Sequence, residues 1–501
     1  MSGKNAGGEP LRNHLENQLI GHTTTSENHA LSYIITTLGV HRGSPRLWLQ
    51  GPMPERAGFL PGARYRVDHG PRHIALRIGA GGTRTVSKKE RRERVEPVID
   101  VNSREDLRVF VGMTRLRIII RSGEILVTPL ESELRILERE NRLIAAAASR
   151  TVSTGALAFG GGVMDHVMHT AFQEIGLDAT LAFANEIRED LASHAMSENP
   201  VIRSATTMIV APLQEAAFDE RLMKQLPRVD VLLAGLPCSA ASRAGRAKRH
   251  LAVPEAHPEV GHLIAAAIVI IARTSPSFFV MENVPTWATS ASAAILRTQL
   301  RDLGYVTHEV EFNAADFGDL EARRRWCLIA VSRGLTLSLD NLQSEVPVTG
   351  GPRTLGEVLE HHDAPHIAER WSTMDGLRAK EARDKEEGKG FKMQIYDASS
   401  PTIGTMTAGM SKVRSTDPKI RHPHKPELLR VPTALEHCRI KGIDPALIDG
   451  LSHTVAHEML GQSVCSGPFR AIFTRLGRAI LDFTALPSMR EWEPAKTVVS
   501  A

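Results

Sequence analysis

A thiol and a carboxyl group each follow an apolar run of this sequence, and together they could carry out nucleophilic chemistry. Cys238 comes after VDVLLAGLP (229–237), and Glu282 ends SFFVME (277–282). A free thiol titrates at about 8.5, so a nucleophilic cysteine needs a favourable local field, which the basic stretch 242–250 and a helix N-terminus could supply. A lone cysteine can instead be a small buried apolar side chain. The acidic partner favours a nucleophile.

Three glycines precede a predicted helix, and an acidic residue follows the next apolar run. Gly160, Gly161 and Gly162 stand in FGGGVMDH, and Glu186 comes about 20 residues later, the usual distance for an acid that meets ribose hydroxyls. Glycines let a ligand approach the backbone, and a helix N-terminus offers free N–H groups. No Gly-Lys-Ser/Thr follows, which argues against a phosphate-binding loop. The pattern predicts a nucleoside-type cofactor, although a tight turn would show the same glycines.

Three consecutive arginines run into another apolar segment in AADFGDLEARRRWC (314–327). Arg323 and Arg325 lie on the same side if this segment is extended. They could hydrogen-bond a pyrimidine carbonyl or backbone phosphates. A solvated run of charge is the common alternative.

A sheet must position these residues, because strand-like apolar runs alternate with longer helical stretches from residue 150 onward. This alternation predicts the α/β class, with a mostly parallel sheet and helices on both faces. Ligands of such sheets bind outside the carboxyl ends of the strands, which is where the residues above stand. The predicted strands are 154–159, 180–185, 206–211, 229–235, 277–283 and 326–332.

The first third of the chain has a different texture. Residues 1–29 are polar and are expected to be disordered, whereas 30–145 hold short β-like runs broken by Gly and Pro and end in a charged helix. LWLQGPMPERAGFLPGARYRV (47–67) weakly resembles the swapped-hairpin DNA-binding modules of AbrB and SymE-like proteins. A β-rich scaffold or oligomerisation unit fits equally well. Basic residues outnumber acidic ones here, which suits a polyanionic partner or a solvated surface.

The bulk composition is that of a soluble protein, with 501 residues, of which 42% are hydrophobic and 24% charged. The N-terminus lacks the apolar core of a signal peptide, and the most apolar run, 263–272, is half a bilayer span. We therefore expect a cytoplasmic protein without a membrane segment.

Neither a metal site nor a disulfide framework is indicated. His453 and His457 stand four residues apart without a third ligand, which favours the surface or core of a helix. No pair of cysteines has the C-x-x-C spacing. The cysteines are Cys238, Cys327, Cys438 and Cys465.

Six segments, in order, are similar to those of DNA cytosine-5 methyltransferases over about residues 150–485. GLPCSAASRAG (235–245) resembles their P-C-x-x-x-S-x-A-G segment, and ENV (282–284) their E-N-V segment. DFGDLEARRR (316–325) resembles D-F-G-x-x-Q-x-R-x-R, and ANEIREDLASHAMSEN (184–199) is similar to the acidic cofactor-binding segment. The others are RVPTALEHCRIKG (430–442), which matches R-x-x-T-x-x-E-x-x-x-x-x-G, and GQSV (461–464), which resembles G-N-x-V.

The resemblance implies a reaction on double-stranded DNA. Cys238 would add to C6 of a cytosine while Glu282 bonds its N3 edge, and C5 would then take the methyl group of S-adenosylmethionine. Loss of the C5 proton and of the thiolate restores aromaticity, while Arg325, with Arg323, would hold the base and the closed loop. Because C5 is inaccessible in a stacked duplex, the base must flip out.

The resemblance also implies a domain plan and further contacts. A Rossmann-like methyltransferase domain would span 150–334 and 426–485, with target recognition in 335–425 and a tail at 486–501. A cognate restriction endonuclease is a candidate partner. The cofactor would contact Gly160, Gly161, Gly162, Glu186, Ile187, Pro237 and Ser463. The DNA would contact Ser242, Arg243, Arg246, Lys248 and Arg249 of a mobile loop, and Lys412 of the recognition region.

Several positions depart from the family pattern. Ala156 and Ala158 stand where Asp and Phe are usual, and Pro212 stands where an Asp would meet the adenine. Glu321 replaces the usual Gln, and Gln462 the usual Asn. These departures weaken the cofactor side of the site more than the thiol and carboxyl pair. Two alternatives therefore stay open: a methyltransferase-like DNA-binding or regulatory protein with little catalysis, and a tRNA cytosine-5 methyltransferase.

Overall fold

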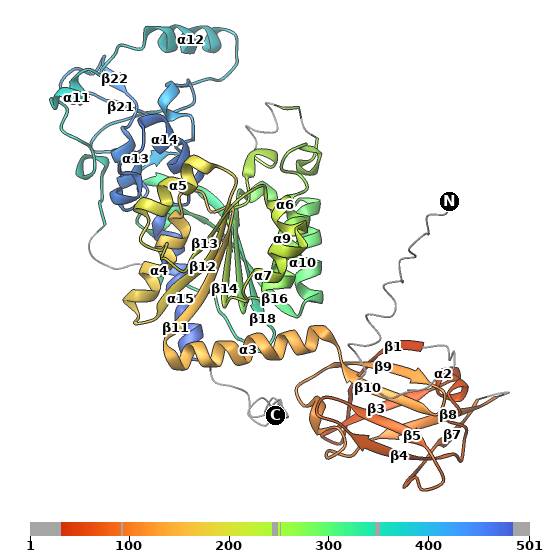
Figure 1. Cartoon of the computed structure of the whole chain (residues 1–501). Coiled ribbons are helices and arrows are strands. Elements are labelled where there is room, and N and C mark those ends of the chain that lie inside the picture. The colour runs from red at the N-terminus through yellow and green to blue at the C-terminus, as the bar shows by residue number, and fades with distance from the viewer. Residues whose placement is uncertain (1–31, 92–93, 243–248, 251, 346–350, 484–501) are drawn as a thin grey trace, which may run out of the picture. The chain divides into compact units, whose positions relative to one another are not determined.

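The chain forms two compact units that divide between Leu130 and Glu131 (Figure 1). In the ranges that the structure describes, no helix is long and apolar enough to cross a membrane. The predicted disordered N-terminus and the C-terminal tail lie outside these ranges. The computed structural model describes residues 32–91, 94–242, 249–250, 252–345 and 351–483.

The first unit contains two antiparallel sheets and a short helix, α2 (Pro52–Arg56). Alternate apolar side chains of the strands, including Leu47, Ile118 and Ile125, are fully buried and form its core. One sheet has the order β1 (Ser32–Thr37), β9 (Arg115–Arg121), β10 (Glu124–Pro129), β5 (Ile74–Ile78), β4 (Arg64–His69), β6 (Arg84–Thr85). The other has the order β2 (Gly39–His41), β3 (Ser44–Gln50), β8 (Arg94–Val101), β7 (Ser87–Arg91).

The charged helix α3 (Glu131–Ser149) belongs to the second unit, although the sequence placed it at the end of a β-rich unit reaching residue 145. Its polar side chains bond to that unit's own strands and loops. Arg139 donates from Nε to Ser332 Oγ at 2.8 Å, and Arg142 donates from Nε to Asp230 Oδ1 at 2.9 Å. A charged helix can be buried when its charges have such partners. The predicted boundary near 145 is therefore wrong by one helix.

The second unit is built on a seven-stranded sheet of order β13-β12-β11-β14-β15-β18-β16. The first five strands pair in parallel as predicted. β18 pairs antiparallel with both of its neighbours, β15 and β16. The sequence does not predict β16, because most of its side chains are polar and only partly buried. The strands are β11 (Thr151–Leu157), β12 (Asp178–Glu186), β13 (Thr207–Val210), β14 (Val231–Ala234), β15 (Phe278–Asn283), β16 (Tyr305–Asn313) and β18 (Arg324–Ser332).

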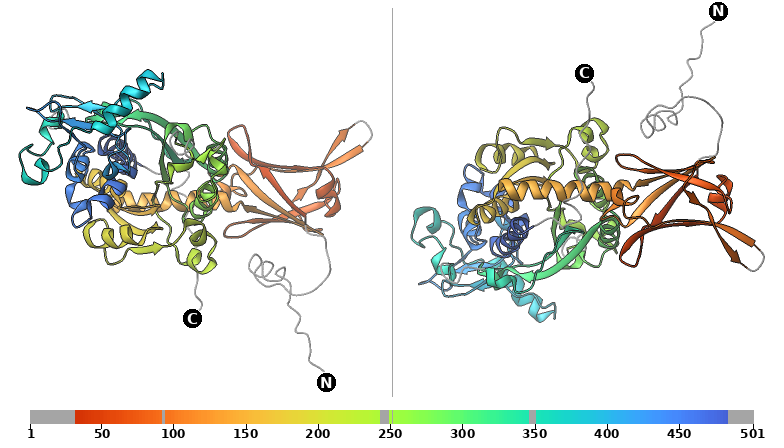
Figure 2. Two further views of the ribbon diagram at one scale, coloured as in Figure 1. Left: turned by 90° about the horizontal axis from the view of Figure 1, so that it is seen from above. Right: turned by 90° about the horizontal axis from the view of Figure 1, so that it is seen from below.

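Helices cover both faces of this sheet (Figures 1 and 2). Along β15, Phe278 and Val280 join the core that includes α4 and α15, while Phe279 and Met281 join the core that includes α9 and α10. A strand buried on both faces reads as a continuous apolar run, which explains FFVM. The helices are α4 (Val163–Glu174), α5 (Glu189–Glu198), α6 (Leu213–Phe218), α7 (Glu220–Gln225), α9 (Leu263–Thr274), α10 (Ala291–Asp302) and α15 (Ser466–Leu481).

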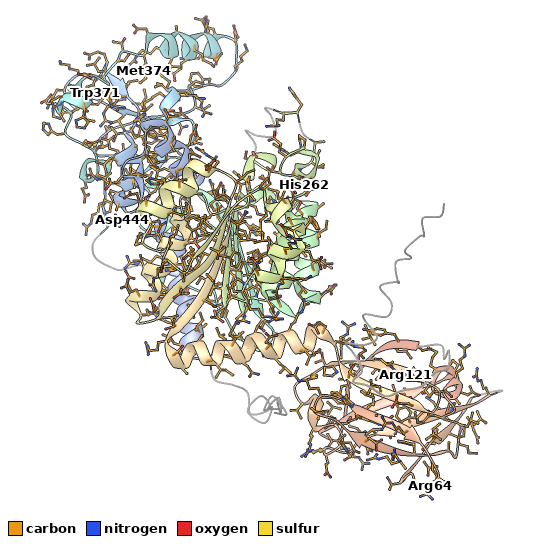
Figure 3. The ribbon with its side chains drawn as sticks, viewed as in Figure 1. Arg64, Arg121, His262, Trp371, Met374 and Asp444 are labelled. Atoms are coloured by element: carbon orange, nitrogen blue, oxygen red, sulfur yellow. The ribbon has the colours of Figure 1, made fainter. Side chains whose placement is uncertain are left out.

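Residues 351–425, which we call the inserted region, form a smaller layer of short elements that includes Trp371 and Met374 (Figure 3). The sequence placed the start of this region at 335, but Leu335, Leu337 and Leu342 pack into the core that includes α15. The apolar core of the inserted region, with Ile403 and Met406, also takes in Leu320 and Ile440 from either side of the insertion. The inserted region is thus packed onto the unit that holds the sheet. Its elements and their neighbours are β17 (Glu321–Ala322), α11 (Pro365–Ala368), α12 (Asp375–Glu386), β19 (Ile395–Tyr396), β20 (Ile403–Gly404), β21 (Lys419–Arg421), β22 (Leu429–Arg430), α13 (Ala434–Ile440) and α14 (His453–Gln462).

The anchoring of α3 can be tested with Arg139→Met. Besides Ser332, the buried guanidinium bonds to the carbonyls of Leu303 at 3.1 Å and Gly304 at 2.5 Å, and all three would lose a donor. We expect the free energy of unfolding in urea to fall by about 3 kcal/mol. The control is Arg301→Met, an exposed arginine 3.4 Å from Asp302, which should change little. Equal effects of the two variants would contradict the anchoring role.

Candidate active site

The thiol of Cys238 and the carboxylate of Glu282 lie at the carboxyl ends of neighbouring strands. Cys238 begins a 3-10 turn (Cys238–Ala240) after β14. The residue reaches solvent, but its thiol lies among protein atoms that desolvate it. Glu282 is at the end of β15, which pairs with β14 in parallel. Parallel neighbours end at the same edge of a sheet, so the two groups lie at one edge, where the sequence places them.

Arg325 holds the carboxylate of Glu282 through an ion pair of 2.7 Å between Nε and Oε1. Both side chains are only 11% exposed, so water screens the pair weakly. The antiparallel register places Glu282 opposite Cys327. Arg325 is two residues from Cys327 along β18, so its side chain lies on the same face of the sheet as that of Glu282. Arg325 Nη1 also donates to the carbonyl of Arg324 at 2.7 Å. The carboxylate is therefore fixed in orientation beside the thiol.

The surroundings of Cys238 favour the protonated thiol over the thiolate. Desolvation by neighbouring protein atoms, followed by the negative charge of Glu282, raises the pKa of the thiol, although Arg325 and Arg323 oppose the shift. The sequence predicts the reverse, from a helix N-terminus and a basic stretch. The basic residues 243–248 lie outside the described ranges, and within those ranges Cys238 stands at the start of a 3-10 turn, Cys238–Ala240.

Arg323 is not aligned with Arg325, although the sequence places both on one side of an extended segment. It lies between β17 and β18, where the strand is interrupted, and its side chain is buried. Its Nη1 donates to Glu321 Oε1 at 3.3 Å and to the carbonyl of Met406 at 3.4 Å, while Nη2 donates to the carbonyl of Gly461 at 3.1 Å. These bonds tie the inserted region to the end of α14. Arg323 therefore stabilises the packing of these segments around the site.

Glu321, which departs from the family pattern, is fully buried and bonded on both oxygens. Oε1 accepts from the backbone N–H of Met406 at 3.0 Å, and Oε2 accepts from Lys441 Nζ at 2.9 Å and from Cys465 Sγ at 3.4 Å. Burial alone would raise the pKa of Glu321, but the cations of Lys441 and Arg323 lower it well below its usual range. The carboxylate that replaces the usual amide is therefore paired with a buried lysine, Lys441. No local sequence pattern indicates this lysine as its partner.

Three imidazoles form a row that runs from the fully buried His437 to the half-buried His453. His437 Nδ1 lies 2.9 Å from His457 Nδ1, and His457 Nε2 lies 3.2 Å from His453 Nε2. Desolvation lowers the pKa of His437 and lowers the pKa of His457 to about 3, so both are neutral. The prediction that His453 and His457 belong to the surface or core of a helix fits their place on α14.

The glycine segment and its acidic partner are in direct contact. Gly160 N donates to Glu186 Oε2 at 2.6 Å, and Asn199 Nδ2 donates to the carbonyl of Gly161 at 2.9 Å. Gly160 has φ +61°, and a Cβ built there would meet open space. Gly162, with φ +73°, begins α4 as its N-cap. An open face, a free helix N-terminus and a carboxylate with spare lone pairs fit the nucleoside part of a cofactor.

The other predicted cofactor residues come from three separate segments. Ile187 is 64% exposed and follows Glu186, where it offers an apolar face to a ring. Pro237 is exposed beside Cys238. Ser463 ends α14, and its hydroxyl donates to the carbonyl of Leu460 at 2.8 Å.

Two departures from the family pattern, Ala158 and Pro212, lie in the segments expected to hold the cofactor. Ala158 has φ +52°, an uncommon conformation for a non-glycine residue. Pro212 is the N-cap of α6 and brings no carboxylate. The backbone just before Pro212 is held by Asn185, whose Nδ2 donates to the carbonyls of Ile209 at 3.1 Å and Ala211 at 2.8 Å.

The predicted DNA-binding residues are only partly described. Ser242 N donates to the carbonyl of Cys238 at 2.8 Å. Arg249 lies 3.6 Å from Glu259, and Lys412 is exposed at the end of the 3-10 turn Met410–Lys412. Arg243, Arg246 and Lys248 lie outside the described residues.

Comparison with known proteins identifies the family of this chain. Residues 168–478 match the family model of the C-5 cytosine-specific DNA methylases, and this match covers more than half of the chain. The chain therefore belongs to the C-5 cytosine-specific DNA methylase family.

Individual relatives match parts of the chain. Type II methyltransferase M1.ScrFI of Lactococcus lactis subsp. cremoris is 28% identical over 262 residues, which cover 50% of this chain and 63% of the relative. Type II methyltransferase M.SsoII of Shigella sonnei is 25% identical over 256 residues, covering 50% and 65%. The chain thus spans just under two thirds of the length of these relatives. The crystal structure of S. pombe Dnmt2 methyltransferase shares the fold, with a TM-score of 0.51 and 15% identity over 66% of this chain and all of the other.

The pairing of Glu321 with Lys441 predicts a non-additive pair of substitutions. Lys441→Met removes a buried partner of the carboxylate and should lower the free energy of unfolding by about 3 kcal/mol. Glu321→Gln should cost as much, because two buried cations then lose their counter-charge. The double variant should lose clearly less than the sum of the two single losses, because only Arg323 is then left without its counter-charge. Urea unfolding at pH 7 measures all three, and additive losses would contradict the pairing.

Proposed function

We propose that this protein methylates C5 of cytosine in double-stranded DNA, with S-adenosylmethionine as the methyl donor. The observation that carries the proposal is the thiol of Cys238 beside the Glu282–Arg325 ion pair at adjacent strand ends. A pure binding protein needs no nucleophile at that edge.

The chemistry follows from the three side chains. The Cys238 thiol passes its proton to Glu282, and the thiolate forms a bond to C6 of the cytosine. Glu282, held by Arg325, donates that proton to N3, which draws the electrons of the C5–C6 double bond into an enamine whose nucleophilic atom is C5. After C5 gains a methyl group, its proton leaves to a solvent base and the electrons of the C5–H bond expel the thiolate from C6. N3 then returns its proton through Glu282 to the thiolate, and aromaticity is restored. A substrate that engages Glu282 reduces the negative charge that raises the pKa of Cys238.

The glycine segment suits the methyl donor. S-adenosylmethionine supplies an electrophilic methyl group when bound. Gly160, Gly162 and the N-terminus of α4 would hold the donor through backbone contacts, and Glu186 would accept from ribose hydroxyls with the lone pairs its present bonds leave free. Ile187 would cover a ring face.

The remaining predictions concern the DNA. The target base must leave the stack to reach Cys238, at a cost of a few kcal/mol that phosphate contacts can offset. We assign those contacts to Arg249 and Lys412 together with Ser242, Arg243, Arg246 and Lys248, and the choice of sequence to the inserted region. The basic N-terminal unit would add non-specific attraction to DNA. A restriction endonuclease partner and a cytoplasmic location stay predictions.

The proposal is tested by Cys238→Ala, with labelled S-adenosylmethionine and mixed-sequence duplex DNA as substrates. Without a thiolate to add at C6, C5 is not activated, and methyl transfer should fall by at least about 1,000-fold while DNA binding is retained. The matched control is Cys438→Ala, which removes a buried thiol of the core and should leave transfer intact.

The outcomes separate the open alternatives. Substantial 5-methylcytosine from the Cys238→Ala protein would contradict the mechanism. DNA binding by the wild-type protein without any transfer would favour a regulatory binder, and methylation of tRNA in place of DNA would favour the RNA enzyme.

A further inference from the structure

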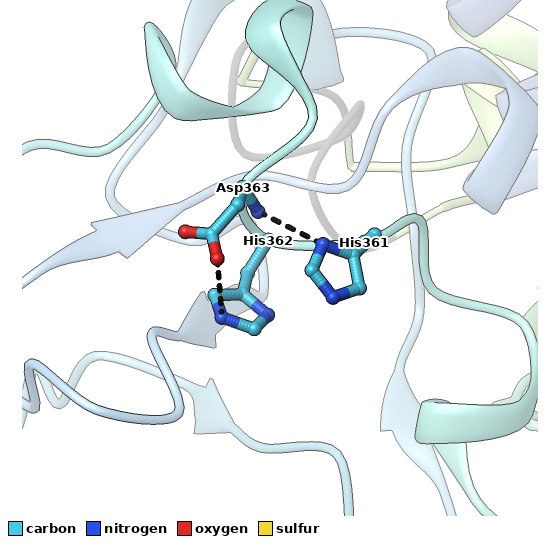
Figure 4. A group of neighbouring side chains, drawn as sticks. All are labelled: His361, His362 and Asp363. Carbon is cyan, nitrogen blue, oxygen red and sulfur yellow. Dashed lines mark hydrogen bonds and ion pairs between the residues drawn. The ribbon is translucent and has the colours of Figure 1, made fainter.

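Three metal-ligating side chains lie together in the inserted region, away from the residues that the methylation chemistry uses. His361, His362 and Asp363 are consecutive, and each offers a ligand atom within 4.8 Å of the other two (Figure 4). His361 and Asp363 are exposed and His362 is half-buried, so an ion can reach them from solvent.

A second segment brings two more imidazoles to the same place. His422 and His424 follow β21, and their ring centres lie 5.3 Å and 5.1 Å from that of His362. The two segments are about 60 residues apart in the chain, which is why sequence spacing alone did not indicate a metal site.

Internal bonds hold both segments in position. His422 is buried, and its Nδ1 accepts the backbone N–H groups of His424 and Lys425, each at 3.1 Å. Its ring lies 4.7 Å from that of Trp371, whose Nε1 donates to the carbonyl of His362 at 3.1 Å. The imidazoles of His362 and His424 are therefore brought together by the fold itself.

The existing hydrogen bonds show which nitrogens can serve as ligands. His362 Nε2 lies 3.3 Å from Asp363 Oδ2, which leaves Nδ1 for an ion. His361 Nδ1 accepts from Asp363 N at 3.3 Å, so coordination through Nε2 requires the ring proton to move to Nδ1 and this long bond to break. His422 uses Nδ1 for two backbone bonds, so it acts as a support and not as a ligand.

We propose that His361, His362 and Asp363, whose ligand atoms already lie together, bind one zinc ion, with His422 and Trp371 as positioning residues. His424, whose ring centre is 5.1 Å from that of His362, would turn toward the ion and complete the set as the fourth ligand. Three imidazoles and one carboxylate match the nitrogen and oxygen ligands of Zn²⁺ and give its usual number of four, whereas Ca²⁺ and Mg²⁺ prefer oxygen throughout. The ion would clamp the segment before α11 to the segment after β21. This site is independent of the proposed methylation, and either proposal can fail without the other.

The test uses the full-length protein, stripped of metal with a chelator and dialysed. Calorimetric titration with ZnCl₂ should give one site per chain, and Co²⁺ should produce the visible absorption of a tetrahedral site. His424→Ala and His362→Ala should each weaken zinc binding by at least about 10-fold. The control is His366→Ala, which removes a neighbouring imidazole bonded to Glu360 at 2.8 Å and should bind zinc normally.

Thermal unfolding keeps the test meaningful if a variant is less stable. Zinc should raise the Tm of the wild-type and His366→Ala proteins and should leave that of His424→Ala unchanged. Failure of the wild-type protein to bind zinc at one equivalent would overturn the proposal. Equal binding by the wild-type and His424→Ala proteins would also overturn it, because His424 would then not be a ligand.

Discussion

The buried carboxylate of Glu321 is the interaction on which the arrangement of the second unit depends. It accepts from Lys441, from Met406 N and from Cys465, and it pairs with Arg323, whose guanidinium reaches Gly461. These partners come from the inserted region and from both sides of it. A buried anion needs its bonds satisfied, so any other packing of these segments would leave Glu321 without partners at a cost of several kcal/mol. The observed packing fixes the strand that carries Arg325, and through Arg325 the orientation of Glu282.

The sheet places the chemistry at one edge for a simple geometric reason. Strands β11, β12, β14 and β15 run in parallel, so the glycine segment, Glu186, Cys238 and Glu282 all follow carboxyl ends. The antiparallel strand β18 then brings Arg325 back toward the same edge. A methyl donor held at the glycines and a base held at Glu282 would meet beside Cys238. The sheet supplies proximity, and the ion pair supplies orientation.

The parts of this arrangement that sequence reasoning could predict are those with local signals. Apolar runs located five parallel strands, and the residues at their ends, Cys238, Glu282 and Glu186, lie where the pattern placed them. Long-range pairing escaped prediction: a charged helix was assigned to the wrong unit because its partners, Ser332 and Asp230, are far away in the chain. Lys441 was missed for the same reason, although an acid in place of the usual Gln is a signal that a cation must lie near.

The most direct test is to trap the bond between Cys238 and the cytosine. DNA that contains 5-fluorocytosine presents a carbon whose fluorine cannot leave as a cation, so the thiolate cannot be eliminated once C5 carries a methyl group. Digestion and mass spectrometry of the complex, formed with S-adenosylmethionine, should find one DNA adduct, on the peptide that contains Cys238. An adduct on another residue, or methylation of ordinary cytosine without any trapped adduct, would contradict the assignment of Cys238 as the nucleophile.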